Sequence, residues 1–197
     1  MLNVAALNAT FPKYPITVSD KGWTYGVWYC STAWTKRALY GQYPGTFLKR
    51  ALALFPTAAD VLHAPSGSLT DLPTGHITFD IHNDDIRRPM FQGDCRSLPF
   101  LDASFDLVLS DPPYSAADSK IYGCDPFPMR EFMAECHRIL RPGGHLGVLH
   151  TSYPSYKRGQ WKLVGLIAVV TGFKRATRIF SIFERPQEAK AKSITSI

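Results

Sequence analysis

Residues 105–114 read Phe105-Asp-Leu-Val-Leu-Ser-Asp-Pro-Pro-Tyr114. The first six form a short apolar run typical of a buried strand, and the prolines end it because proline has no N–H to continue a hydrogen-bonded ladder. Beyond the strand, the Asp111 carboxylate and nearby carbonyl oxygens can converge as hydrogen-bond acceptors beside the flat ring of Tyr114. The stretch therefore predicts a stiff, acceptor-rich corner at the carboxyl end of a strand.

Such a corner suits an exocyclic amino group on a planar base. The lone pair of that amine is delocalised into the ring, which makes it a poor nucleophile. Acceptors for both N–H hydrogens aim the lone pair and stabilise the positive charge that develops on nitrogen. Asp111 and the Pro112 carbonyl would hold the amine while Tyr114 stacks on the base. The structural alternative is a strand-ending aspartate with a Pro-Pro turn and a core tyrosine.

Strand and helix patterns extend on both sides of this corner. Apolar residues at helical spacing predict helices at 47–55 and 128–140. In the first helix, Thr46 is the expected cap, and the expected core face consists of Leu48, Ala51, Leu52 and Phe55. Apolar runs predict strands at 60–64, 76–80, 90–92, 105–110, 145–150, 162–170 and 174–183. Gly172 favours an antiparallel hairpin between the last two strands, and the whole pattern indicates an open α/β sheet.

Polar or turn residues follow four of these strands, at Pro65-Ser-Gly-Ser68, Asp80, Asp94 and Asp111-Pro-Pro-Tyr114. Ligands of open α/β sheets bind beyond the carboxyl ends of the strands, so a binding site is predicted there. Only eight residues separate Gly67 from His76, and nine separate Asp80 from Met90. A crossover helix with its loops needs about 10–12 residues, so the sheet is expected to be abridged.

The 197 residues suit one main domain. We divide the chain into an aromatic-rich, irregular lobe at 1–45 with a short hairpin near Trp23, a main domain at 46–185 and a polar tail at 186–197. The longest uncharged apolar stretch, 163–170, is too short to span a bilayer, and the first residues lack the basic region of a signal peptide. Four single cysteines and six histidines show neither disulfide nor metal-binding spacing. We therefore expect a cytoplasmic protein without a metal.

Charge divides the chain into three parts. Residues 1–59 carry six basic and one acidic residue, residues 60–135 carry five and thirteen, and residues 136–197 carry eleven and two. Basic flanks suit a polyanion such as nucleic acid, and an acidic centre suits a cationic ligand. Candidate phosphate contacts are Lys157, Arg158, Lys162, Lys174, Arg175 and Arg178. A plain solvated surface is the alternative for these residues.

Seven aromatic residues crowd the stretch 23–43. They are Trp23, Tyr25, Trp28, Tyr29, Trp34, Tyr40 and Tyr43. Such rings can stack on the bases of a single strand, or they can pack the N-terminal lobe against the sheet.

The chain resembles class I S-adenosylmethionine-dependent methyltransferases, specifically those that methylate adenine N6 or cytosine N4. Asp111-Pro-Pro-Tyr114 is similar to the catalytic motif of that family, and Arg138-Ile-Leu-Arg-Pro-Gly-Gly144 is similar to the turn before its fifth strand. Phe91-Gln-Gly-Asp94-Cys95 and the stretch 98–106 resemble the segment that leads into the motif. The resemblance covers about residues 40–184 and implies an abridged Rossmann-like methyltransferase sheet with a C-terminal antiparallel hairpin.

The resemblance also implies roles for individual residues. The catalytic corner would be Asp111, Pro112, Pro113 and Tyr114, with adenine N6 as the preferred target. S-adenosylmethionine would be held by Asp111 together with Tyr43, His63, Pro65, Ser66, Gly67, Ser68, Asp80, Asp94 and Cys95. Asp80 would bind the ribose hydroxyls and Asp94 the adenine amino group, with Asp84 or Asp85 as substitutes for Asp80.

The chain departs from the family pattern in the loop after the first strand of this domain. His63 stands where the family has an acid, and Leu69 where it has a glycine. Two alternatives to the base methyltransferase therefore stay open, a methyltransferase of protein glutamine amides and a non-catalytic subunit. The chain also shows no target-recognition domain. The N-terminal lobe, the segment Ser115 to Met129, a second copy or a partner subunit would then contact the nucleic acid.

Overall fold

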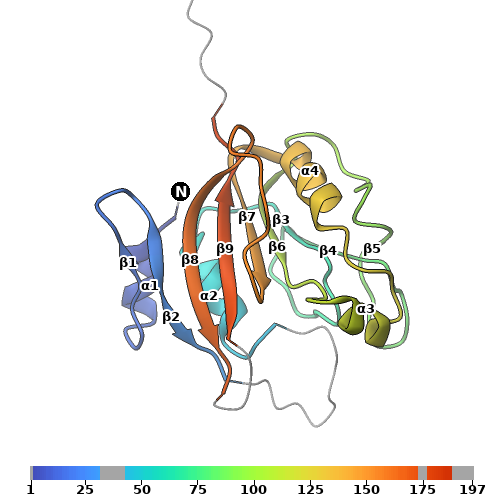
Figure 1. Cartoon of the computed structure of the whole chain (residues 1–197), viewed down its shortest axis with the longest axis horizontal. Helices are drawn as coiled ribbons and strands as arrows, with labels where there is room; N and C mark the ends of the chain where they lie inside the picture. The colour runs from blue at the N-terminus through green and yellow to red at the C-terminus, as the bar shows by residue number, and fades with distance from the viewer. Residues whose placement is uncertain (1, 32–42, 173–176, 188–197) are drawn as a thin grey trace, which may run out of the picture.

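The computed structural model describes residues 2–31, 43–172 and 177–187, and these form one mixed sheet with helices on both faces (Figure 1). The helices are α1 (Val4–Thr10), α2 (Phe47–Leu54), α3 (Ala116–Tyr122) and α4 (Met129–Ile139). The strands are β1 (Thr17–Val18), β2 (Thr24–Tyr29), β3 (Val61–His63), β4 (His76–Asp80), β5 (Phe91–Gln92), β6 (Phe105–Ser110), β7 (Leu140–His150), β8 (Lys162–Val170) and β9 (Arg178–Glu184).

The strand order across the sheet is β1-β2-β8-β9-β7-β6-β3-β4-β5. From β3 the chain runs outward through β4 to β5 and then returns to pair β6 with the other side of β3. The strands β3 to β7 run parallel to one another, so their carboxyl ends share one edge. This reversal between β3 and β6 is the switch point at which α/β sheets bind ligands.

The C-terminal strands confirm the predicted antiparallel hairpin. β9 pairs antiparallel with both β8 and β7, which places it between two strands that precede it in the chain. Residues 174–176 of the predicted last strand lie outside the described residues, and β9 begins at Arg178. The expected abridged α/β sheet with a C-terminal antiparallel hairpin is therefore confirmed.

The N-terminal region differs from the irregular structure that the sequence predicts. It contains α1, and β1 and β2 form an antiparallel pair that extends the main sheet, because β2 runs parallel beside β8. The separate domain at 1–45 stays a prediction, and Trp34 and Tyr40 lie outside the described residues. Of the other aromatics predicted there, Trp28 and Tyr43 are buried, whereas Trp23, Tyr25 and Tyr29 are exposed.

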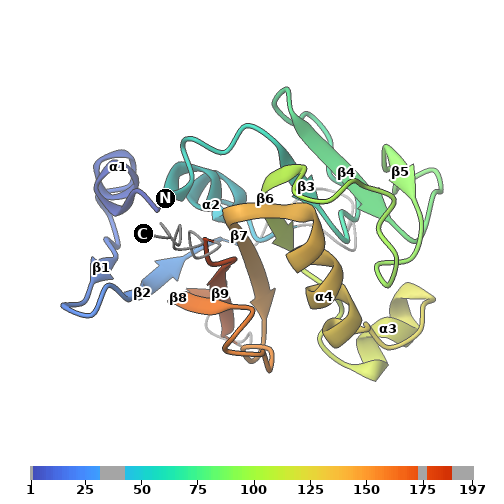
Figure 2. The same cartoon turned by 90° about the horizontal axis from the view of Figure 1, so that it is seen from above.

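The two faces of the sheet carry separate cores. Figure 2 shows α1 and α2 on one face and α4 on the other. On the α2 face, Trp28, Phe47 and Phe180 pack edge to face or tilted, with ring centroids 4.9–6.0 Å apart, and this cluster ties β2 and β9 to α2. On the α4 face, Phe132, Cys136 and Ile139 project from the helix into the second core.

The predicted helices form, with small shifts. Of the expected core face, Ala51 and Phe55 are buried, whereas Leu48 and Leu52 are only partly buried, and α2 buries Phe47 and Leu54 as well. The sequence analysis missed α3, a short helix capped by the Ser115 hydroxyl. As expected, residues 64–75 and 81–90 contain no crossover helix. Within the described ranges, no helix combines the length and apolar character needed to cross a membrane.

Close packing between the cores leads to a test at Gly147. A Cβ atom at this position would lie 2.6 Å from the Phe180 ring and 2.9 Å from Leu109. We expect Gly147→Ala to lower the free energy of unfolding by about 1–3 kcal/mol, because the ring cannot withdraw from a packed core. Urea denaturation measures this, with Gly159→Ala as the control because no atom lies within 4 Å of that Cβ position. Equal stability of both variants would contradict the packing.

Candidate active site

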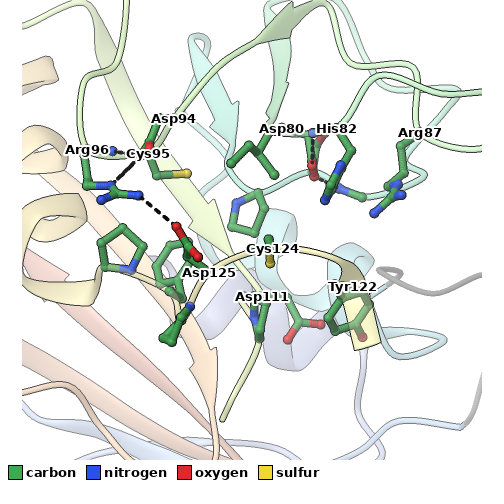
Figure 3. A pocket seen from close by; sticks show the side chains of 18 of the residues that line it. Asp80, His82, Arg87, Asp94, Cys95, Arg96, Asp111, Tyr122, Cys124 and Asp125 are labelled. Atoms are coloured by element: carbon green, nitrogen blue, oxygen red, sulfur yellow. Dashed lines mark hydrogen bonds and ion pairs between the residues drawn. The ribbon is translucent and has the colours of Figure 1, made fainter. Parts of the chain in front are cut away.

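A pocket with an empty volume of about 850 Å³, open to solvent, lies at the carboxyl edge of the parallel strands. Its walls come from the ends of β3, β4, β5 and β6 and from the segment after α3 (Figure 3). The lining residues that the sequence analysis predicted are Tyr43, Pro65, Ser66, Gly67, Asp80, Asp94, Cys95, Asp111 and Pro113. The strand topology thus gathers, at one cavity, residues that lie far apart in the chain.

Asp80 ends β4 and organises the loop that follows β3. One carboxylate oxygen accepts the Gly67 N–H at 2.8 Å, and the other accepts the His82 N–H at 3.0 Å. Gly67 has a φ of 55°, a conformation in which a Cβ atom is strained, so glycine fits this turn. Asp84 instead pairs with Arg87, and the Asp85 side chain is fully exposed.

The end of β5 supplies an acid and a cysteine to the pocket. Asp94 accepts hydrogen bonds from the Arg96 backbone and guanidinium, and the backbone hydrogen bond is the main reason that its pKa lies below the ordinary value. Arg96 also reaches Asp125 at 3.8 Å across the pocket mouth (Figure 3). Burial raises the pKa of the Cys95 thiol to about 12, so Cys95 is a neutral wall rather than a nucleophile.

The corner after β6 opens into the same pocket. The Asp111 carboxylate accepts a hydrogen bond from the Tyr114 hydroxyl and lies 3.8 Å from the Arg178 guanidinium. Arg178 also lies over the Tyr114 ring, 5.1 Å from its centroid, and the ring of His150 meets Tyr114 edge to face at 5.2 Å. The corner is therefore a preorganised set of one acid, one ring and one cation at the ends of β6, β7 and β9.

Burial raises the pKa of Asp111 to about 6, although Arg178 and the Tyr114 hydroxyl both favour the carboxylate. The Asp111 side chain is 14% exposed to solvent. The pKa of the buried Tyr43 is raised well above its ordinary value by burial and by the charge of Asp111. Asp111 is thus a carboxylate that titrates close to neutral pH inside a ligand-sized pocket, as a functional acid or base often does.

His63 lies behind the pocket wall. It is fully buried, with Nε2 3.0 Å from Nδ1 of His76 and Nδ1 3.5 Å from the Tyr43 hydroxyl. Burial lowers the pKa of His63 to about 3, so the ring is neutral. His63 therefore does not take the place of an acid facing the ligand; it supports Tyr43, which does line the pocket.

Three further predicted residues do not line the pocket. Ser68 and Pro112 are buried beside it, and Tyr114 contacts it through Asp111. The analysis missed Ile81, His82, Arg87, Arg96, Tyr122 and the run from Cys124 to Pro128, although it singled out the segment 115–129 as a substrate contact. The turn residues Gly123, Pro126 and Pro128 mark that segment as a loop, and this was the available signal.

The lining of the pocket offers polar groups to a ligand. Among the described residues, two buried atoms in its lining, Ser66 Oγ and His82 Nε2, have no hydrogen-bond partner. Such atoms normally find a partner, and a bound ligand would supply one. The acids Asp80, Asp94 and Asp111 add acceptors suited to hydroxyl, amino and cationic groups.

Comparison with known proteins agrees with this geometry. Residues 78–148, from β4 to β7, match the family model of a methyltransferase domain. A phthiotriol/phenolphthiotriol dimycocerosates methyltransferase of Mycobacterium leprae is 40% identical over 73 residues, which are 36% of this chain and 23% of that protein. The chain thus spans about a quarter of the length of the curated relative that it matches.

Solved structures of methyltransferases are also similar. TrmN from Thermus thermophilus is 19% identical, with a TM-score of 0.48 over 75% of this chain and 51% of the other. The 1,6-didemethyltoxoflavin-N1-methyltransferase of Burkholderia thailandensis, solved with S-adenosylhomocysteine, is 16% identical, with a TM-score of 0.49 over 69% of this chain and 75% of the other. Residues 78–148, which supply Asp80, Asp94 and Asp111 to the pocket, thus match a methyltransferase domain.

The buried acid generates a test of the electrostatics. Because the pKa of Asp111 in the fold lies above its ordinary value of 3.8, its ionisation opposes folding. The contribution of Asp111 to the free energy of unfolding should therefore fall as the pH rises from about 4 to about 6, by up to about 3 kcal/mol. The lowered pKa of His63 acts in the opposite direction over this range, so the total change does not report Asp111 alone. Urea denaturation of the unaltered chain and of Asp111→Asn across this range isolates the contribution, because the stability of the variant relative to the unaltered chain should rise by this amount.

A second variant checks the role of the cation. Arg178→Gln removes the charge that lowers the pKa of Asp111, so this pKa should rise further, as read by carbon NMR of the carboxyl groups. A pKa near 4 in the unaltered chain, or no change in the variant, would contradict the described site.

Proposed function

We propose that the chain is an S-adenosylmethionine-dependent N-methyltransferase that acts on the exocyclic amino group of a nucleic-acid base, with adenine N6 preferred. The observation that carries this proposal is the position of Asp111 and Pro113, which line the same pocket as Gly67, Asp80 and Asp94. A corner buried in the interior, with no cavity beside it, would have spoken against the proposal. The acceptor group and the expected cofactor residues instead share one cavity.

The proposed roles follow from the contacts. Gly67 and Asp80 would hold the ribose side of S-adenosylmethionine and Asp94 its adenine, and the bound cofactor would supply an electrophilic methyl group. The target amine would donate N–H hydrogen bonds to Asp111 and the Pro112 carbonyl, taking over the acceptor that the Tyr114 hydroxyl now occupies. Asp111 would stabilise the positive charge that develops on nitrogen, and its raised pKa suits it to take up the released proton.

A protein glutamine amide is the second candidate, because an amide NH2 would fit the same acceptors. The charge pattern favours the nucleic acid: β7, β8 and β9 come from the basic segment 136–197, and β1 and β2 come from the basic segment 1–59. A single assay separates the two candidates. Labelled S-adenosylmethionine is supplied in parallel with DNA, RNA and total protein, and the labelled product is identified.

Asp111→Ala tests the catalytic corner. We expect methyl transfer to fall by at least about 100-fold, since one preorganised electrostatic contact to a transition state is worth roughly this much. Mass spectrometry of nucleosides from DNA and RNA incubated with cofactor measures N6-methyladenine. Asp85→Ala, a fully exposed acid in the same half of the sheet, is the matched control. Full turnover in Asp111→Ala would remove Asp111 from the mechanism.

Asp80→Ala tests the cofactor site. The variant loses the acceptor of the Gly67 and His82 N–H groups, as well as the acceptor proposed for the ribose. A hydrogen bond to a charged group contributes about 1.5–3 kcal/mol, so the Kd for S-adenosylmethionine should rise at least about tenfold. Isothermal titration calorimetry measures it, with Asp85→Ala as the control. Unchanged affinity in Asp80→Ala would place the cofactor elsewhere.

A further inference from the structure

Among the residues that the structure describes, no helix covers one face of the sheet at its β2–β8–β9 end. Figure 1 shows these strands facing the viewer, with α1 and α2 behind them and α4 to one side. Because Trp28 points into the core on the α2 side, its neighbours in β2 point to the uncovered side: Tyr25 is 50% exposed, Val27 50% and Tyr29 38%. We name this surface, which consists of Tyr25, Val27, Tyr29, Leu166, Ala168 and Ile179, the open sheet face.

Strand register makes the surface continuous. Tyr25 lies beside Leu166, Val27 beside Ala168, and Ala168 beside Ile179, so these side chains share one side of the sheet. Leu166, Ala168 and Ile179 are themselves only half-buried. A row of apolar and aromatic side chains in solvent is uncommon on a sheet and marks a surface that binds something.

Aromatic rings extend the open sheet face onto the β1–β2 hairpin. The Tyr14 ring is exposed and lies against Tyr29, with centroids 6.1 Å apart, and the Lys13 ammonium lies 5.5 Å from the Tyr14 centroid. Trp23, also exposed, lies at the start of β2. Flat rings with cations at their margin are the surface on which single-stranded bases stack.

The charge around the open sheet face is positive. Tyr156 and Trp161 pack on Phe183 of β9, which places the exposed Lys157 and Arg158 between them at the margin of this face. Neither cation forms an ion pair with a carboxylate in the described ranges. The ranges 11–31, 151–172 and 177–184 contain two acidic residues, Asp20 and Glu184, and five basic residues besides Arg178, which lies at Asp111. The acidic side chains gather instead in the pocket, at Asp80, Asp94, Asp111 and Asp125.

The open sheet face also leads to the catalytic corner. His150 lies beside Ile179 in the register of β7 and β9, and its ring contacts Tyr114. Neighbouring side chains therefore connect the open sheet face to this corner, in the order Val27, Ala168, Ile179, His150 and Tyr114. A strand bound on this face would have one end at the proposed site of methyl transfer.

We propose that the open sheet face binds single-stranded nucleic acid, with bases stacked on Tyr25 and Tyr29 and phosphates near Lys157 and Arg158. The inference deepens the proposed function and rests on it, since it supplies a contact surface for the proposed substrate. Tyr25 and Tyr29 are four residues apart in one strand, roughly 13 Å, so their rings would stack on different nucleotides. The basic margin favours nucleic acid over a second copy of the chain, which would carry the same charge.

The test measures binding rather than catalysis. Fluorescence anisotropy of a fluorescein-labelled single-stranded DNA, and of an RNA of the same sequence, gives the Kd of the full chain. We expect Tyr25→Ser with Tyr29→Ser to weaken binding of at least one strand roughly 10- to 100-fold, because each stacked base is lost. Tyr25→Phe with Tyr29→Phe keeps the rings and should keep the affinity. Leu101→Ser, 82% exposed but on the acidic half, is the control.

Two further measurements add independent readouts. Lys157→Gln with Arg158→Gln should reduce the slope of log K against log salt by about one to two, as expected for lost phosphate contacts. Light scattering reports the oligomeric state. A dimer that the serine variants dissociate, with unchanged oligonucleotide affinity, would assign the open sheet face to a second copy and overturn the proposal. Unchanged affinity in the monomeric serine variants would also overturn it.

The two proposals can fail separately. If single strands bind through Tyr25 and Tyr29 but no methylated base forms, the open sheet face stands and the proposed function fails. In the opposite outcome, the serine variants form N6-methyladenine at the rate of the unaltered chain and bind single strands with the same affinity. In that case the proposed function stands and the proposal for the open sheet face fails.

Discussion

The pairing of β3 with both β4 and β6 is the constraint on which the site depends. These parallel ladders bring the ends of three strands, at Ala64, Ile81 and Asp111, to one edge of the sheet. The loops that follow these strands therefore begin side by side at this edge, and their first polar residues line one pocket. Long crossover helices are not needed for this, because register alone fixes which strand ends are neighbours.

Much of the fold could be predicted because it follows from local patterns of apolar and turn residues. The strands at 76–80, 105–110 and 162–170 have the predicted bounds, since apolar runs with turn residues at both ends define them. The pairing of β2 with β8 could not be predicted, because it joins segments far apart in the chain and Thr24–Tyr29 shows no partner signal of its own. The short helix α3 has only seven residues, and the residue that it buries is the polar Ser119, so no apolar periodicity indicated it.

The site divides in the same way. Motif residues such as Gly67, Asp80 and Asp94 lie at the pocket because each lies at the end of a strand or within four residues after it. His63 looked like a substitute for an acid, but the contact of its ring with His76 depends on neighbouring strands, which a linear sequence does not reveal. The run from Cys124 to Pro128 lines the pocket without any chemical motif, so only its turn residues indicated a loop.

The buried imidazole pair also affects which ligands the cavity tolerates. A histidine that became cationic directly behind Tyr43 would repel a positively charged molecule in the pocket. Because the interior keeps the His63 ring uncharged down to a pH of about 3, that repulsion does not arise under physiological conditions. The buried histidine therefore adds no opposing charge, and the carboxylates of the pocket determine the sign of the potential that an entering cation meets.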